Sequence, residues 1–102
     1  MTEQWFALLH TPGPALPAGQ SVFDHPGFAE HVAFLRQLAA DGLLVAAGPL
    51  TDSDGDGLTV IRADSVAQAQ QLAEQQDGSV RAGVLRVTVR PWQVVLAPIT
   101  DR

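Results

Sequence analysis

Histidine and aspartate side chains give this sequence its clearest capacity for chemistry. His31 lies among apolar residues that recur at helical spacing, including Phe28, Val32 and Leu35, so its ring should turn toward the core. A buried imidazole needs a hydrogen-bond partner, and Asp77 follows the next predicted helix, which should cover the same face of the sheet. A carboxylate on one imidazole nitrogen fixes the tautomer and increases the basicity of the other, which suits a general base. Periodicity alone, however, favours a simpler interpretation, in which a core histidine is hydrogen-bonded and the aspartate only ends a helix.

The other two histidines give weaker signals. His10 ends the first predicted strand, on the same face as Leu8, and could either point into the mouth of a pocket or lie exposed at a loop. Without a partner in the sequence, exposure is the favoured interpretation. His25 precedes Pro26, which favours extended backbone. His25 and His31 do not share a helical face as a two-histidine metal motif would, and cysteine is absent. We therefore predict no metal site, although the three histidines would suffice in number for zinc.

An acidic segment at 52–57 imitates the start of a calcium-binding EF-hand loop. That motif needs a bidentate carboxylate at its twelfth position. Counted from Asp52, this position is Ala63, inside a predicted strand. The segment is therefore predicted to be a glycine-rich turn. No glycine-rich phosphate-binding loop occurs either, so nucleotide chemistry and other cofactors are not predicted.

These residues must be positioned by elements of alternating type. Apolar patterning and breaker residues predict strands at 5–9, 43–47, 58–63 and 84–89 and helices at 26–41 and 66–76. Pro91 interrupts the last strand, since proline cannot donate to the ladder, and 92–96 could form an additional edge strand. The order β-α-β-β-α-β predicts an α+β fold of the ferredoxin-like type with an extra C-terminal edge strand.

The predicted sheet has a face that its own helices cannot cover. Two helices can cover only one side, yet the first two strands are apolar on both faces. Trp5 and Trp92 suit anchoring roles in a core or an interface better than stacking on nucleic acid bases, because no basic groove accompanies them. A second copy of the chain is the simplest cover, so we predict a homodimer whose sheets pack face to face.

Composition limits the classes of function. The sequence has 102 residues, which suits one domain over 1–102, and its mean hydropathy of +0.10 is that of a globular chain. The net charge is −5 with only six basic residues, all arginine, so nucleic-acid binding is not predicted. No apolar run reaches the length of a membrane span, and the N-terminus lacks the basic region of a signal peptide. A cytoplasmic protein is expected.

Several segments together resemble a known family. The most specific are the helical histidine, the strand end of the form GxLxxAGP, and an aspartate before an AGV that starts the last strand. They belong to segments 26–35, 42–49, 57–61, 76–77, 82–84 and 87–92. Over nearly its whole length the chain resembles the YciI-like, or YCII-related, family. This resemblance implies a dimeric α+β barrel built from ferredoxin-like halves.

The resemblance also implies a pocket with a catalytic pair, which corresponds here to His31 and Asp77. The residues predicted to bind substrate around this pair are His10, Phe28, Gly48, Pro49 and Thr59. Two departures should reshape the pocket. Relatives often have serine or glycine where this chain has Leu58, and an aromatic residue shortly after the aspartate, where this chain has 78–80, Gly-Ser-Val.

The family includes a dehydrochlorinase that acts on a chlorinated hydroxyquinol, and most of its members have no assigned reaction. The resulting hypothesis is a small cofactor-independent enzyme. It would use acid–base chemistry for elimination or isomerisation of a small cyclic or aromatic, oxygenated molecule. The alternatives are a non-catalytic dimer that binds a small ligand or regulates through the same pocket, and a purely structural dimer.

Overall fold

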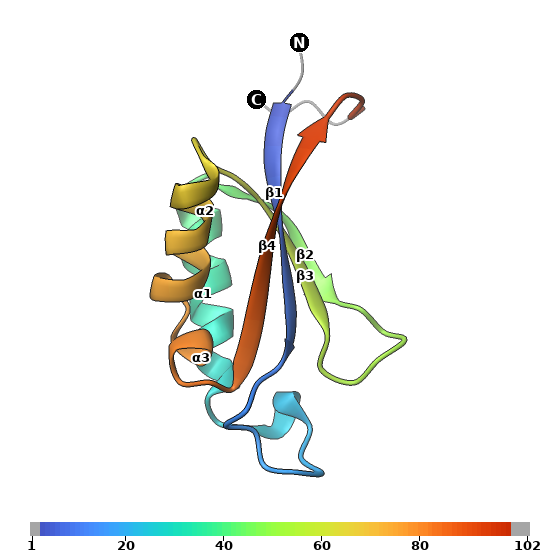
Figure 1. Cartoon of the computed structure of the whole chain (residues 1–102), viewed down its shortest axis with the longest axis vertical. Helices are drawn as coiled ribbons and strands as arrows, with labels where there is room; N and C mark the ends of the chain where they lie inside the picture. The colour runs from blue at the N-terminus through green and yellow to red at the C-terminus, as the bar shows by residue number, and fades with distance from the viewer. Residues whose placement is uncertain (1–2, 99–102) are drawn as a thin grey trace.

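The computed structural model describes residues 3–98, which form one antiparallel sheet with its helices on one side (Figure 1). The sheet is four-stranded in the order β2-β3-β1-β4. This arrangement confirms the predicted α+β ferredoxin-like fold. In chain order the elements are β1 (Glu3–Pro12), the short 3-10 helix η1 (Val22–Asp24), α1 (Phe28–Ala40), β2 (Leu44–Pro49), β3 (Gly57–Arg62), α2 (Val66–Gln71), the π-helical turn η2 (Leu72–Gln76), α3 (Gly78–Arg81) and β4 (Leu85–Val94).

The main core lies between the sheet and the helices. Alternate residues of β1 face the helices. From α1, the side chains of His31, Phe34 and Leu38 are buried against the sheet. Phe34 was not part of the predicted apolar stripe, so the buried face of α1 is rotated slightly from the one expected. The main core cluster consists of Phe6, Leu8, Phe34, Leu38, Ile61, Ala69 and Ala73.

The second helical region is more divided than predicted. A single helix was expected over 66–76, but α2 widens into the π-helical turn η2. The expected break at 77–79 is present, yet the chain then starts a new helix, α3. Asp77 is the N-cap residue of α3, and its side chain accepts a hydrogen bond from the backbone N–H of Ser79. Such a cap satisfies a donor that the first helical turn would otherwise leave without a partner.

The prediction of a separate C-terminal edge strand was wrong. β4 continues without interruption past Pro91 to Val94 and pairs with β1 along its whole length, with Phe6 opposite Pro91. β4 is itself an edge strand. An edge strand tolerates proline because the missing N–H can be on the side that has no neighbouring strand.

The face of the sheet away from the helices carries an apolar cluster around Trp5. Trp5, Val60 and Val94 bury one another there, and Trp92 lies edge-on to Trp5, with 5.7 Å between ring centroids. Trp92 nevertheless remains 48% exposed. Figure 1 shows the helices on the opposite side, so no helix of the described residues covers this face. Within residues 3–98, no helix combines the length and apolar character needed to cross a bilayer.

Candidate active site

A hydrogen bond between His31 and Asp77 forms the centre of the site. Nδ1 of His31 lies 2.7 Å from Oδ2 of Asp77, and both side chains are buried. The other carboxylate oxygen accepts hydrogen bonds from the Ser79 backbone N–H at 2.9 Å and the Ser79 hydroxyl at 2.7 Å. Both oxygens of Asp77 are therefore engaged, which fixes the carboxylate and, through it, the imidazole. The contact predicted between His31 and Asp77 is present.

The packing of α3 against α1 brings the pair together. Gly78 permits this approach, because a Cβ at that position would lie 2.6 Å from Oε1 of Glu30 on α1. Gly78 and Ser79 were expected to reshape the pocket. They are instead buried beside the carboxylate and are not part of the cavity wall. Their effect on the site is to position Asp77.

The electrostatics of Asp77 favour the ionised carboxylate. Burial by itself would raise the pKa of Asp77, but the hydrogen bonds from His31 and Ser79 outweigh it and hold this pKa below its ordinary value. An ionised acceptor next to Nδ1 requires that nitrogen to carry a proton. In a neutral imidazole the lone pair is then on Nε2, an assignment that follows from the hydrogen bond.

His10 also belongs to the site, and the expectation that it is exposed was wrong. Its side chain is only 2% exposed, because β1 continues beyond it and keeps it on the face toward the helices. Its ring centroid lies 4.7 Å from that of His31. Nε2 of His10 is 3.7 Å from Oδ2 of Asp77, too far for a hydrogen bond. Burial, together with the nearby His31, lowers the pKa of His10 to about 4, so this ring is neutral at pH 7.

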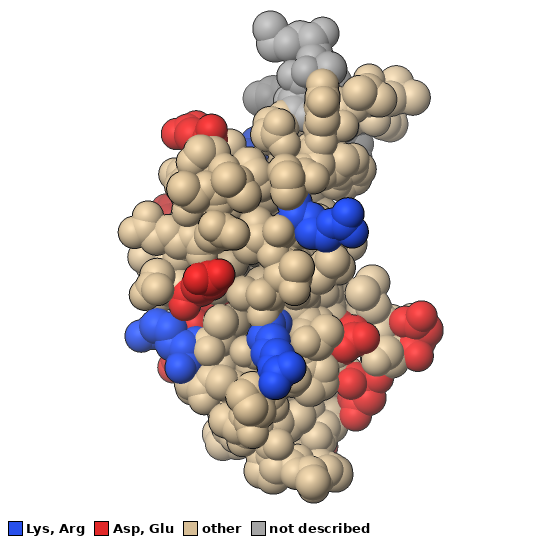
Figure 2. Space-filling view, viewed as in Figure 1, with Lys and Arg blue, Asp and Glu red and all other residues tan. Residues whose placement is uncertain are grey.

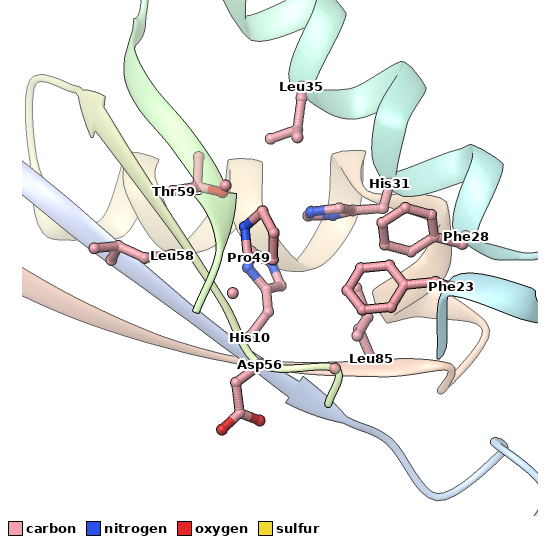
Figure 3. A pocket seen from close by; sticks show the side chains of 13 residues that line it. His10, Phe23, Phe28, His31, Leu35, Pro49, Asp56, Leu58, Thr59 and Leu85 are labelled. Atoms are coloured by element: carbon pink, nitrogen blue, oxygen red, sulfur yellow. The ribbon is translucent and has the colours of Figure 1, made fainter. Parts of the chain in front are cut away.

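The two histidine rings border a partly open cavity of about 70 Å³ (Figure 3). His31 and all five residues predicted to bind substrate line it, whereas Asp77 lies behind His31, outside the wall. Most of the wall is apolar. The complete lining is His10, Phe23, Phe28, His31, Leu35, Gly48, Pro49, Gly55, Asp56, Gly57, Leu58, Thr59 and Leu85.

Some lining residues escaped the sequence analysis. Phe23 comes from η1, a single turn within a stretch read only as loop, and its ring packs on Phe28 with 5.2 Å between centroids. Helical periodicity cannot show so short an element. Leu85 faces the cavity from β4, where strand alternation could have indicated it. Leu58 does line the cavity, as the departure at that position suggested.

Comparisons with known proteins identify the family of the chain. The family model of the YCII-related domain matches residues 5–93. The chain belongs to the YCII-related family. It is 33% identical over 72 residues to YjpA of Bacillus subtilis (strain 168), an uncharacterized protein, and this match covers 71% of the chain and 82% of YjpA.

A solved structure with the YCII-related fold supports the architecture. It is the 5-chloro-2-hydroxyhydroquinone dehydrochlorinase TftG from Burkholderia phenoliruptrix AC1100, in complex with 2,5-dihydroxybenzoquinone. The superposition has a TM-score of 0.62 and covers 85% of this chain and 92% of that one, at 19% sequence identity. The likeness at this identity shows that the two proteins share a fold.

In this YCII-related chain, the groups able to hold a metal differ from the histidine trio considered in the sequence. His25 is separate, and its Nδ1 accepts a hydrogen bond from the backbone N–H of Gly27 at 2.9 Å. His10, His31 and Asp77 instead offer three ligand atoms that all lie within 4.8 Å of one another. The acidic segment forms a turn between β2 and β3, as predicted, although Gly57 already begins β3, and Figure 2 shows acidic side chains gathered near that turn.

Proposed function

We propose that this chain is a cofactor-independent acid–base enzyme that catalyses elimination or isomerisation of a small cyclic or aromatic, oxygenated molecule. The observation that carries this proposal is the buried hydrogen bond of 2.7 Å between His31 and Asp77, with His31 in the cavity wall. A histidine oriented by a carboxylate is a common way to build a general base. The fold shared with a dehydrochlorinase whose structure holds a dihydroxybenzoquinone is consistent with this substrate class.

In the proposed reaction, Nε2 of His31 removes a proton from a carbon or hydroxyl of the substrate. The electron pair left behind forms a new double bond, and in an elimination the leaving group departs with its own bonding pair. Asp77 stabilises the imidazolium without taking its proton, which then passes to the leaving group, to another substrate atom or to water. His10 and Thr59 provide polar contacts to the substrate. Phe28, Gly48 and Pro49 border the rest of the space, where the substrate ring would lie.

The proposal includes a homodimer formed through the apolar sheet face around Trp5 and Trp92. A half-exposed aromatic side chain such as Trp92, beside a buried apolar cluster, is typical of an interface. A single domain over 1–102 and a cytoplasmic location remain predictions from the sequence.

The test is a screen of hydroxylated and halogenated quinols and cyclic enols, with products followed by chromatography. Turnover that is lost in His31→Gln and Asp77→Asn but kept in the control His25→Gln would support the proposal. His25 is a suitable control because its ring lies outside the cavity wall. Equal turnover in all four proteins would refute a role for the pair.

The alternative is a non-catalytic module that binds a small apolar ligand. The predominantly apolar wall of the cavity favours it. Saturable binding of screened compounds, followed by shifts in the NMR signals of the His31 ring and accompanied by no turnover, would select this alternative.

A further inference from the structure

His10 has no hydrogen-bond partner for either ring nitrogen within the described part of the chain. Both nitrogens are buried, and a buried polar group without a partner is costly. Packing does not require a histidine at this position. The two preceding residues of β1 on the same face, Phe6 and Leu8, are apolar and belong to the core. An unpaired, deeply buried imidazole at a cavity wall points to a ligand that would satisfy it.

The surrounding atoms define what that ligand would be. Nε2 of His10 lies 3.7 Å from Oδ2 of Asp77, and Nδ1 of His31 lies 2.7 Å from the same oxygen. In a tetrahedral zinc site, bonds of about 2.0–2.1 Å place neighbouring ligand atoms about 3.3 Å apart. The first distance must shorten slightly and the second must lengthen by roughly 0.6 Å to reach that spacing. Two imidazole nitrogens and one carboxylate oxygen suit zinc and its transition-metal neighbours better than magnesium or calcium.

We propose that Nε2 of His10, Nδ1 of His31 and Oδ2 of Asp77 form a binding site for a divalent transition-metal ion of the zinc type. A fourth ligand would be a water molecule from the cavity, which both histidine rings border. The other oxygen of Asp77 keeps its hydrogen bonds to Ser79, and this outer contact holds the carboxylate in place for the ion.

Binding of the ion replaces the hydrogen bond of the catalytic pair. Nδ1 of His31 cannot both donate a proton to Asp77 and coordinate a metal. The proton therefore moves to Nε2, His31 stays neutral, and no atom changes oxidation state. Nε2 then lacks the lone pair that would accept a substrate proton. The consequence, which rests on the proposed function, is that the ion inhibits the enzyme.

The experiment starts from full-length protein freed of metal with EDTA and then dialysed. Zn²⁺ is added in a calorimeter, and Co²⁺ is used in parallel because its visible absorption reports tetrahedral coordination. We expect one ion per chain with a dissociation constant of about 10 μM or tighter. His10→Gln should weaken binding at least about tenfold, and His25→Gln should bind as the wild type does. No saturable binding up to about 1 mM, or equal binding by His10→Gln, would overturn the proposal.

A second measurement does not depend on how the variant folds. Nitrogen NMR of the wild-type rings should show coordination shifts at Nε2 of His10 and Nδ1 of His31 when Zn²⁺ is added. Shifts confined to His25 would refute the site. Metal binding with the expected variant pattern in a protein that turns over no compound would support the metal site and leave the enzyme proposal without support, so the two can fail separately.

Discussion

His10 should make the stability of this fold depend on pH in a window set by its burial. The pKa of His10 is lowered from 6.5 to about 4 in the folded protein, first by burial and then by the nearby His31. Between these values the unfolded chain binds a proton at His10 and the folded chain does not. The free energy of unfolding therefore falls as the pH drops from 6.5 toward 4. Each pH unit is worth about 1.4 kcal/mol, so the whole window amounts to about 3 kcal/mol.

The assay is urea unfolding of metal-free wild type and His10→Leu at equal protein concentration, in EDTA, at about pH 7 and about pH 5. Leucine has a similar volume and no group to protonate. Between these pH values we expect the wild type to lose about 2 kcal/mol more than His10→Leu. Other titrating groups contribute to both proteins and cancel in this difference. At pH 7 the variant should be at least as stable as the wild type, because it removes two unpaired buried nitrogens.

Parallel curves for wild type and His10→Leu would refute the reasoning, since they would mean that His10 reaches water or finds a partner when protonated.

Three further predictions concern the pair, the loop and the sheet face. Asp77→Asn should lower turnover of any compound found in the screen by about 100-fold or more, measured by initial rates, whereas Asp64→Asn, at an exposed position, should not. Gly13→Ala should lower the free energy of unfolding, measured by thermal unfolding, by about 2 kcal/mol or more, because the added Cβ would lie 2.2 Å from the backbone oxygen of Gly83. Gly48→Ala, with no atom within 4 Å of the added Cβ, should cost little, and equal losses would contradict this. Trp92→Asp should convert a dimer to a monomer in sedimentation, while Val66→Asp, at a similarly exposed apolar residue on α2, should not. A wild type that sediments as a monomer at micromolar concentration would refute the interface.

The sequence predicted the fold better than it predicted the site. Apolar spacing located His31 on the buried face of α1, since a helix of 13 residues gives several turns of pattern. The catalytic role proposed for Asp77 came from the family resemblance, because capping of the four-residue helix α3 leaves no periodic signal. The exposure expected for His10 was wrong for a related reason. Strand pattern indicates which face a residue shares but not where the strand ends, and β1 runs on to Pro12.

The position of His10 also bears on the choice among enzyme, binding module and structural dimer. A purely structural core would favour an apolar residue there, since Phe6 and Leu8 precede it on the same face and its own nitrogens have no partner. Buried polar groups without partners tend to occur at functional sites, where a residue is kept for its function although it lowers the stability of the fold. Asp77 lies close by as a fully buried carboxylate, and its ionised form depends on the hydrogen bonds from His31 and Ser79. An unpaired buried imidazole in the cavity wall, next to a buried carboxylate, is difficult to explain by packing, and it favours a site that acts on, or binds, a ligand.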